Sequence, residues 1–301
     1  MTVEFALGDA GDTSEGTLAM GLPLLSGQPR ELLASAVEPE GDEDGIMLWR
    51  SRDNLVGFAR VEHGGDIEGA TGWLYARLLS AVRRLNLYRI WNCVPQINGQ
   101  APGELENYRA FCRGRSLAFE AAFGDGFARA LPAASGVGTA DDALTVAFLA
   151  GPLPVRHVEN PSQVPAYEYP PEHGPRAPSF ARATVVGSGT TVDAFISGTS
   201  AVVGHGTVAP GDTPGQVDCT LQNLVLISRA CGLGDRLGSG SGCRRHFKVY
   251  LRNAGDLPAV EAELKRRLFV PGDSVSYLGA EICRAALNVE IEVVVRGSER
   301  S

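Results

Sequence analysis

The sequence lacks the patterns that mark metal-binding and disulfide-rich proteins. Its six cysteines, at positions 93, 112, 219, 231, 243 and 283, form no C-x-x-C pair, and no histidine pair stands at metal-ligand spacing. A zinc site is therefore not expected. Thiols this scattered in a chain of 301 residues also do not predict a disulfide scaffold. We expect neither a bound metal nor a cofactor.

Long apolar runs and basic stretches are also missing. No apolar run reaches the roughly 18 residues of a membrane span, and the first residues carry neither a basic nor an apolar leader region. These features predict a cytoplasmic protein with no membrane partner. Lysine is rare and the net charge is −8, so nonspecific nucleic-acid binding is not expected. An anionic small substrate would need a local cluster of arginines.

The composition is that of a globular protein, with 44% hydrophobic and 21% charged residues, and the length allows two domains or one large one. An internal repeat supports two units. In the first half, apolar residues follow strand and helix periods alternately. The predicted elements are a strand over 54–64, a helix over 67–86, a strand over 88–99, a helix over 104–124 and a strand over 143–151.

The second half repeats this order. Pro214 near the start and Gly232 just past the end are typical of a helix over 213–232, and Asp256 is a plausible N-cap of the next helix. The predicted elements are a strand over 194–206, the helix over 213–232, a strand over 246–255, a helix over 256–269 and a strand pair over 274–295. Both halves thus read β-α-β-α-β, which predicts an α+β fold with helices on one face of each mixed sheet.

A proline-rich stretch, 155–180, lies between the halves. Proline at this density disfavours helices and central strands. On composition the stretch reads equally well as a linker between domains or as an ordered functional loop, since it also carries histidine, arginine, tyrosine and glutamine.

Three stretches together resemble the chorismatase family: ENPSQVPAYEYPPEHGPRAPSFARA, FISGTSAVVGHGTVAPGD and GAEICRAALNVEIEVVV. The second half alone resembles a single subunit of the RidA (YjgF) fold. The resemblance implies two RidA-like (chorismate mutase-like) units in one chain, with chorismate as the substrate and the site near their interface. The implied division is an N-terminal segment over 1–45, RidA-like domains over 46–154 and 181–301, and the connecting segment 155–180 near the site.

The family resemblance also bears on the product. Chorismatases that form 3-hydroxybenzoate resemble this chain in having glycine in the SGT strand and cysteine in the terminal strand, where the diol-forming type has alanine. Gly198 and Cys283 stand at these positions. The resemblance therefore implies 3-hydroxybenzoate and pyruvate as products, with Cys283 steering the intermediate and Gly198 leaving room for it. The alternative product is a dihydroxycyclohexadiene carboxylate.

Cleavage of an enolpyruvyl ether begins with protonation of carbon, which needs an acid that is still protonated near neutral pH. Glu290, within the β-branched run VEIEVVV, has neighbours that could raise its pKa by burial. Period-2 alternation alone allows another interpretation, in which Glu290 and Glu292 form the solvated face of an edge strand. With the family resemblance we expect Glu290 to be the acid and Glu292 to remain on that solvated face.

Further site residues follow from the substrate. A dicarboxylate calls for arginine forks, and we expect Arg115, Arg176 and Arg182 to supply them, although each could also be a surface residue. Cys283 and Glu290 are expected on neighbouring strands of one hairpin. Residues that could bond the ring hydroxyl or the enolpyruvyl group are Tyr108, Tyr169, Gln163 and Asn92.

Two further stretches are expected to serve the fold. His205 in GHG reads as a turn residue, and the glycine-rich 237–245 as a mobile hairpin connection, since it lacks the phosphate-loop pattern. Two other functions stay open: a RidA-type enamine or imine deaminase, and a non-catalytic metabolite-binding protein. The sequence predicts a monomer or small homo-oligomer and does not fix the product ratio.

Overall fold

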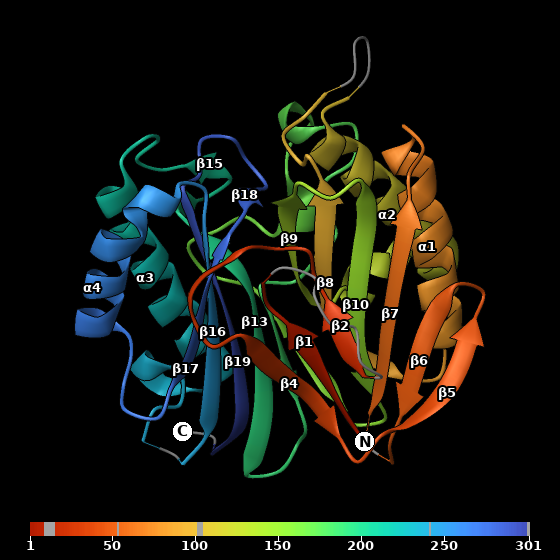
Figure 1. The fold of residues 1–301 in the computed structure, drawn as a ribbon, viewed down its shortest axis with the longest axis horizontal. Coiled ribbons are helices and arrows are strands. Elements are labelled where there is room, and N and C mark those ends of the chain that lie inside the picture. Colours follow the sequence, from red (N-terminus) through yellow and green to blue (C-terminus); the bar gives the residue numbers. More distant parts are fainter. Residues whose placement is uncertain (9–15, 53, 101–104, 241, 300–301) are drawn as a thin grey trace.

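Two seven-stranded sheets form the body of the protein, a computed structural model that describes residues 1–8, 16–52, 54–100, 105–240 and 242–299. The first sheet is built mainly from the first half of the chain (Figure 1). Its strands, in order across the sheet, are β18 (Glu281–Ile282), β9 (Ala133–Thr139), β8 (Asn86–Pro95), β10 (Ala143–Gly151), β7 (Leu55–Glu62), β6 (Ile46–Arg50) and β5 (Glu38–Glu43).

The second sheet is built mainly from the second half. Its strands, in order, are β11 (Val155–Val158), β12 (Ala183–Val186), β13 (Thr191–Ser200), β19 (Val289–Glu299), β16 (Arg244–Leu251), β17 (Ser274–Gly279) and β3 (Leu24–Gly27). Each sheet borrows one edge strand from the other half of the chain, because β18 pairs with β9 and β3 pairs with β17. These exchanges tie the two halves into one body.

The predicted repeat is confirmed by the order of the strands. The first sheet contains β9-β8-β10-β7 and the second contains β17-β16-β19-β13, with one parallel pair in each, β8 with β9 and β16 with β17. Two details of the prediction were wrong. The strand over 133–139 was missed, and 274–295 is not a strand pair, because β16 lies between β17 and β19.

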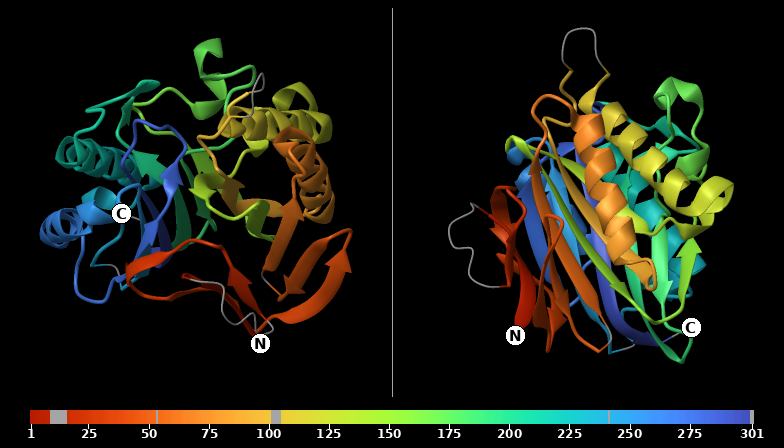
Figure 2. Two further views of the ribbon diagram at one scale, coloured as in Figure 1. Left: turned by 45° about the horizontal axis from the view of Figure 1, so that its top comes forward. Right: turned by 90° about the vertical axis from the view of Figure 1, so that its right-hand side faces the viewer.

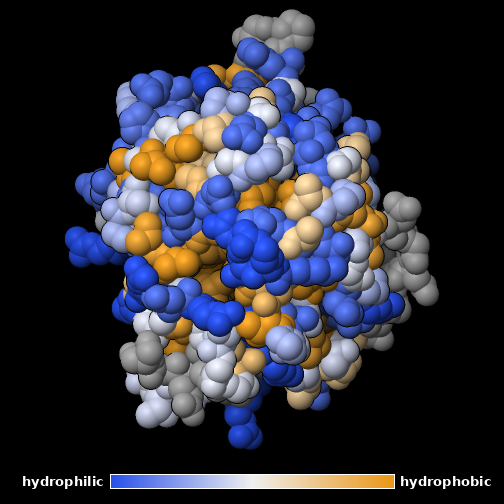
Figure 3. All heavy atoms as spheres, turned by 90° about the vertical axis from the view of Figure 1, so that its left-hand side faces the viewer, coloured by the Kyte–Doolittle hydropathy of each residue, from blue (hydrophilic) through white to orange (hydrophobic). Residues whose placement is uncertain are grey.

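Within the described residues, four helices cover the outer faces of the sheets (Figure 2). They are α1 (Ile67–Ala81) and α2 (Asn107–Phe123) on the first sheet, and α3 (Thr213–Cys231) and α4 (Leu257–Arg267) on the second. Residue 104 of the second predicted helix lies outside the described residues. The face of α3 and α4 mixes hydrophilic side chains with apolar patches (Figure 3). No helix in the described part of the chain is long and apolar enough to cross a membrane.

The expected helix ends are largely correct. Pro214 lies in the first turn of α3, and Gly232 ends it with a φ of 79°, in the left-handed region that glycine tolerates. Asp256 stands at the N-cap position of α4 but makes no capping hydrogen bond there. Its carboxylate instead accepts a hydrogen bond from the hydroxyl of Thr213 at 2.9 Å, which links the start of α4 to that of α3.

The inner faces of the two sheets meet in a core that the N-terminal residues complete. A three-stranded sheet of β2 (Thr17–Ala19), β1 (Thr2–Ala6) and β4 (Arg30–Ser35) lies across them (Figure 1). Phe5 packs edge-on against Trp91 at 5.0 Å, and Phe195 from the second sheet joins the same apolar cluster. Residues 1–45 are therefore part of the core.

The expectation for Glu292 was wrong. Strand β19 is central in its sheet, one of its faces packs in the core between the sheets and the other packs under α3, and Glu292 is only 1% exposed. Its carboxylate accepts hydrogen bonds from Arg89 at 2.6 Å and from Trp91 at 2.9 Å, and it pairs with Lys248 at 2.7 Å. Glu292 is the centre of a buried ionic network between the sheets.

The connecting stretches are ordered. Residues 155–180 form the edge strand β11 and the short 3-10 turns η2 (Ala166–Glu168) and η3 (Pro171–His173). A small hairpin of β14 (Val202–Val203) and β15 (Gly206–Thr207) follows β13. The stretch 237–245, whose residue 241 lies outside the described residues, joins α3 to β16, so a hairpin connection was the wrong expectation. The remaining 3-10 turns are η1 (Gly124–Ala130), η4 (Gly234–Arg236) and η5 (Ala254–Asp256).

Candidate active site

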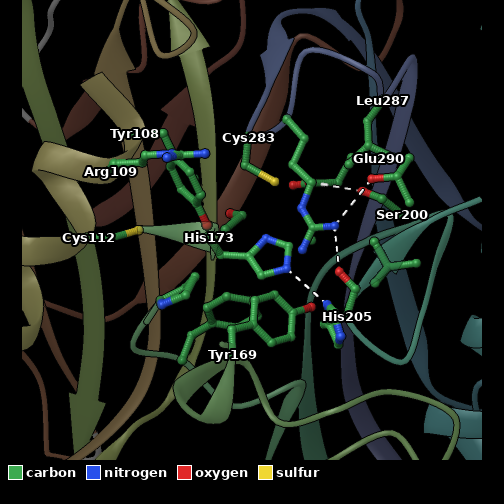
Figure 4. A pocket seen from close by; sticks show the side chains of 18 of the residues that line it. Tyr108, Arg109, Cys112, Tyr169, His173, Ser200, His205, Cys283, Leu287 and Glu290 are labelled. Carbon is green, nitrogen blue, oxygen red and sulfur yellow. Dashed lines mark hydrogen bonds between the residues drawn. The ribbon is translucent and has the colours of Figure 1, made fainter. Parts of the chain in front are cut away.

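A cavity of about 500 Å³ lies between the two halves of the chain. Helix α2 and strand β9 line it from the first half. Strands β13 and β19, the β14–β15 hairpin and the loop 283–287 line it from the second. The proline-rich segment contributes a further wall, with Tyr169 and His173 among its side chains (Figure 4). The segment is therefore part of this site and more than a linker.

Glu290 lies in the wall of this cavity on β19. Glu290 lies opposite Ser200 in the pairing of β19 with β13. The Ser200 hydroxyl donates a hydrogen bond to a carboxyl oxygen of Glu290 at 3.1 Å (Figure 4). Burial raises the pKa of Glu290 from 4.5 to about 7. The Ser200 hydrogen bond lowers it in part, and the negative charge of Glu292 raises it. A large fraction of this carboxyl is thus protonated at neutral pH and can act as a general acid.

The absence of a side chain at Gly198 leaves the space that the Glu290 carboxyl occupies. The register of β13 against β19 shifts between Ile196 and Thr199, so Gly198 lies in a β-bulge beside the cavity. A Cβ atom on Gly198 would fall far inside van der Waals contact with Oε1 of Glu290. Only glycine lets the carboxyl lie directly over this strand.

Cys283 reaches the same wall from a different direction than expected. It follows β18, which pairs with β9 of the first sheet, so Cys283 and Glu290 do not lie on one hairpin. The thiol nevertheless lines the cavity near Glu290 (Figure 4). Burial raises the pKa of Cys283 to about 12, and the Glu290 charge adds to this shift. The sulfur is therefore a neutral thiol, which is a poor nucleophile.

Arg115 lines the cavity from α2 and is only 3% exposed. Its guanidinium lies over the rings of Tyr75 and Phe119, at 5.2 and 5.8 Å. Its Nε and one terminal nitrogen are buried and have no hydrogen-bond partner among the described residues. An unpaired buried guanidinium costs free energy that a ligand carboxylate would offset.

Four other expected residues, Arg182, Tyr169, Gln163 and Tyr108, also line the cavity. Arg182 donates a hydrogen bond to the Tyr169 hydroxyl at 2.8 Å, and its buried Nε has no hydrogen-bond partner among the described residues but lies 3.9 Å from a carboxylate oxygen of Glu159. Gln163 donates to the carbonyl of Val202 at 2.9 Å, which ties the proline-rich segment to the β14–β15 hairpin. Tyr108 faces the cavity from α2 (Figure 4), and burial raises the pKa of its hydroxyl, which therefore stays neutral.

Two expected residues lie outside the cavity lining. Arg176 pairs with Glu120 of α2 at 2.8 Å, and both side chains are about one third exposed. Asn92 is buried in β8, where it accepts a hydrogen bond from Tyr75 and donates to the carbonyl of Ser135. Asn92 supports the strand that carries Ser135, one of the lining residues.

Sequence reasoning missed several lining residues, among them Arg109, Ser200 and Arg284. Arg284 directly follows Cys283 and donates to the carbonyl of His205 at 2.8 Å. Its place in the family-like stretch EICRA was a signal that could have identified it. Four arginines face three glutamates in this cavity, Glu106, Glu172 and the raised-pKa Glu290. This excess of positive charge in the cavity favours an anionic ligand, although the chain as a whole carries a negative net charge.

His205 is a turn residue, as expected, in the β14–β15 hairpin, and it also lines the cavity. Its Nδ1 lies 3.0 Å from Nε2 of His173 (Figure 4). The carboxylate of Glu172 lies beside both rings.

Comparison with known proteins agrees with this geometry. Residues 32–150 match the family model described as "Chorismatase FkbO/Hyg5-like, N-terminal". A "3-hydroxybenzoate synthase" of Streptomyces hygroscopicus is 37% identical over 280 residues, covering 87% of this chain and 80% of the relative. A "Chorismatase" of Streptomyces rapamycinicus is 35% identical over 271 residues, with the same coverages.

A solved structure extends the match to nearly the whole fold. A crystal structure of a chorismatase superposes with a TM-score of 0.83 at 30% sequence identity and covers 98% of this chain and 92% of its own. The family resemblance of the three quoted stretches and the predicted α+β fold class are thus confirmed.

Proposed function

The chain belongs to the chorismatase family, and we propose that it converts chorismate to 3-hydroxybenzoate and pyruvate. The observation that carries the proposal is that one cavity holds both a candidate general acid and a candidate carboxylate-binding group. A buried carboxyl with a pKa raised to about 7, Glu290, shares the cavity with the buried, partly unpaired guanidinium of Arg115. Chorismate is a dicarboxylate whose enolpyruvyl group needs a proton on carbon.

Glu290 would begin the reaction by protonating the terminal methylene of the enolpyruvyl group. The positive charge that develops on the neighbouring carbon weakens the ether bond to ring carbon C3. Arg115 and Arg182 would hold the two carboxylates, so that the methylene lies against Glu290. General acid catalysis of this kind is worth about 100- to 10,000-fold.

The fate of the ring decides the product. In the 3-hydroxybenzoate branch the 4-hydroxyl attacks C3 as the C3–O bond breaks and pyruvate leaves, which gives an epoxide. Loss of the C3 proton, with formation of the C3–C4 double bond and opening of the C4–O bond, then yields the aromatic ring with the oxygen left on C3. Substrate and products balance without water, whereas the diol branch consumes one water. Cys283 and Gly198 border the Glu290 carboxyl and would therefore shape this branch.

The product ratio should change when these two residues are replaced. Cys283→Ala should keep substantial pyruvate release, because protonation does not use the thiol, while diol appears beside 3-hydroxybenzoate. Adding Gly198→Ala should increase the diol share, because the new Cβ forces the Glu290 carboxyl to move. Chromatography of the chorismate reaction, with pyruvate measured by a coupled lactate dehydrogenase assay, gives both quantities.

Gly136→Ala is the matched control for that experiment. Gly136 also lines the cavity, but its Cβ would meet only Tyr108, at 3.9 Å, which is ordinary contact. The control should keep the wild-type product ratio. If Cys283→Ala abolishes both products equally, the thiol acts before the branch and the proposed division of roles fails.

Arg115→Ala should lower kcat/KM by about 30- to 5,000-fold, the effect of about 2–5 kcal/mol when a desolvated carboxylate loses its partner. Arg113→Ala is the matched control, because Arg113 lies on the same helix but points outward to Glu68 at 3.0 Å. Arg176→Ala should also have little effect, since Arg176 pairs with Glu120 outside the lining. Wild-type kinetics in Arg115→Ala and Arg182→Ala together would contradict the carboxylate assignment.

Incubation with chorismate tests the proposal as a whole. Equal amounts of pyruvate and 3-hydroxybenzoate support it, diol with pyruvate indicates the other chorismatase branch, and an unchanged substrate contradicts it. A monomeric or small homo-oligomeric state, a cytoplasmic location and the absence of a nucleic-acid partner stay predictions.

A further inference from the structure

Three side chains in the cavity wall form a set that sequence spacing does not predict. His173 and Glu172 lie at the η3 turn of the proline-rich segment, and His205 lies 32 residues further on in the β14–β15 turn. The fold places one nitrogen of each imidazole and one carboxylate oxygen of Glu172 within 4.8 Å of one another. Two imidazoles and one carboxylate are a donor set that zinc uses.

The three distances are mutually consistent with a single ion. Nε2 of His173 lies 3.0 Å from Nδ1 of His205, and Oε1 of Glu172 lies 3.7 Å and 3.5 Å from these two nitrogens. The point equidistant from all three atoms is about 2.0 Å from each, and zinc–nitrogen and zinc–oxygen bonds in proteins are about 2.0–2.2 Å long. The three ligand–ion–ligand angles at that point would be about 100° to 140°, with the ion nearly in the plane of the three ligand atoms, which leaves a fourth position open above or below this plane.

The neighbouring groups hold the two imidazoles in this arrangement. The ring of Tyr169 lies 4.9 Å from that of His173, and the two imidazole rings are nearly perpendicular, at 80°. Arg284 donates a hydrogen bond to the backbone carbonyl of His205, which fixes the β14–β15 turn (Figure 4 shows both histidines). Glu172 is the most exposed of the three ligands, with 67% of its side chain accessible.

We propose that Glu172, His173 and His205 form a binding site for a divalent transition ion, of which zinc is the best fit, in the wall of the substrate cavity. The ion replaces the direct contact between the imidazoles and joins the proline-rich segment to the β14–β15 hairpin. The fourth position takes water or a carboxylate. Because Arg284 is close by and only one ligand is anionic, we expect micromolar binding, well below the affinity of four-ligand structural zinc sites.

Zinc titration of the EDTA-dialysed full-length protein tests this directly. We expect one zinc per chain by calorimetry and a rise in melting temperature with zinc concentration, since the ion binds only the folded chain. Cobalt should bind at the same site with the strong visible absorption of a four- or five-coordinate ion. His173→Ala and His205→Ala should each weaken binding at least tenfold, and Glu172→Gln should weaken it less.

His63→Ala is the control, because His63 lies in an exposed turn away from the cavity and should leave binding unchanged. His173→Gln and His205→Gln keep a polar side chain and serve if an alanine variant melts early in EDTA. Absence of one-to-one binding below about 100 µM zinc would overturn the proposal. Binding that survives in the His173→Gln/His205→Gln double variant would also overturn it, and would point to cavity thiols as the ligands. None of these readouts depends on turnover, so failure here leaves the proposed reaction untouched.

Discussion

Glu290→Gln should reduce pyruvate release from chorismate by about 1,000-fold, within the range of about 100 to 10,000 typical of a lost general acid. Glutamine keeps the shape of the side chain and can still accept the hydrogen bond from Ser200, but it has no proton to transfer to carbon. Substrate binding should therefore persist. Single-turnover kinetics give the rate of the chemical step, and calorimetry with the inactive variant gives the dissociation constant.

The pH dependence of the wild type belongs to the same prediction. The reaction needs the protonated carboxyl, and the folded-state pKa of Glu290 is raised to about 7. The kcat/KM value should therefore be highest below this pH and fall as pH rises through it. The residual activity of Glu290→Gln should lack this decline.

Stability gives an independent check that the variant is folded. A carboxyl whose pKa is raised on folding destabilises the native state above its unfolded pKa of about 4.3, and the full penalty is reached above the folded value. Glu290→Gln should therefore melt at a higher temperature than the wild type near pH 8, and the difference should vanish near pH 4. Glu281→Gln, an exposed neighbour on β18, should change neither the rate nor the melting curve. A Glu290→Gln enzyme that keeps most of its rate would show that another acid protonates the substrate.

The repeated architecture could be predicted because the local spacing of apolar residues indicates most of its helices and strands. Each helix has one apolar face, and Pro214 and Gly232 mark the ends of α3. The strand β9 was missed because its sequence, AASGVGT, has small residues and no β-branched alternation. It is a strand because β8 pairs with it, which is long-range information.

The error at Glu292 has the same origin. Alternation along VEIEVVV distinguishes two faces but does not show which neighbours cover them. The position of β19 between β13 and β16 is set by the whole sheet, and the N-terminal sheet covers the remaining face. An acid in a β-branched run can therefore mean burial with partners as well as exposure.

The site was predicted in part for a chemical reason. A dianionic substrate calls for buried arginine, and Arg115 and Arg182 are buried in the cavity wall, whereas Arg176 pairs with Glu120 near the surface. The two cavity histidines could not be found by ligand spacing, because His173 and His205 come from separate loops that only the folded chain brings together.

The ionic network around Glu292 should contribute strongly to stability. Glu292 lies between the buried cations Arg89 and Lys248, and the only other acid in this network is Glu31, which pairs with Lys248 among the described residues. Glu292→Gln leaves a buried positive charge without compensation, which typically costs about 3–5 kcal/mol. Urea unfolding at neutral pH should show this as a large decrease in the transition midpoint.

Glu263→Gln is the control that separates burial from charge pairing. Burial alone would raise the pKa of Glu292, but Lys248 and Arg89 outweigh it and lower the pKa to about 2. Hydrogen bonds from Arg266 and Arg267 lower the pKa of Glu263 to about 2 as well, yet this carboxylate lies at the surface of α4. Exposed pairs are screened by water, so Glu263→Gln should leave the unfolding midpoint nearly unchanged.

Two pH profiles complete the test of Glu292. A carboxylate with a lowered folded-state pKa stabilises the protein above its unfolded value of about 4.3, and this is lost as pH falls toward 2. The part of the stability difference between wild type and Glu292→Gln that comes from this carboxylate should therefore shrink as pH falls from about 4.3 toward 2. The charge of Glu292 also raises the pKa of Glu290, two residues away. Its removal should move the decline of kcat/KM to lower pH, in a direction that a loss of stability alone does not predict. An unshifted profile in a folded variant would mean that the network supports the fold and does not tune the acid.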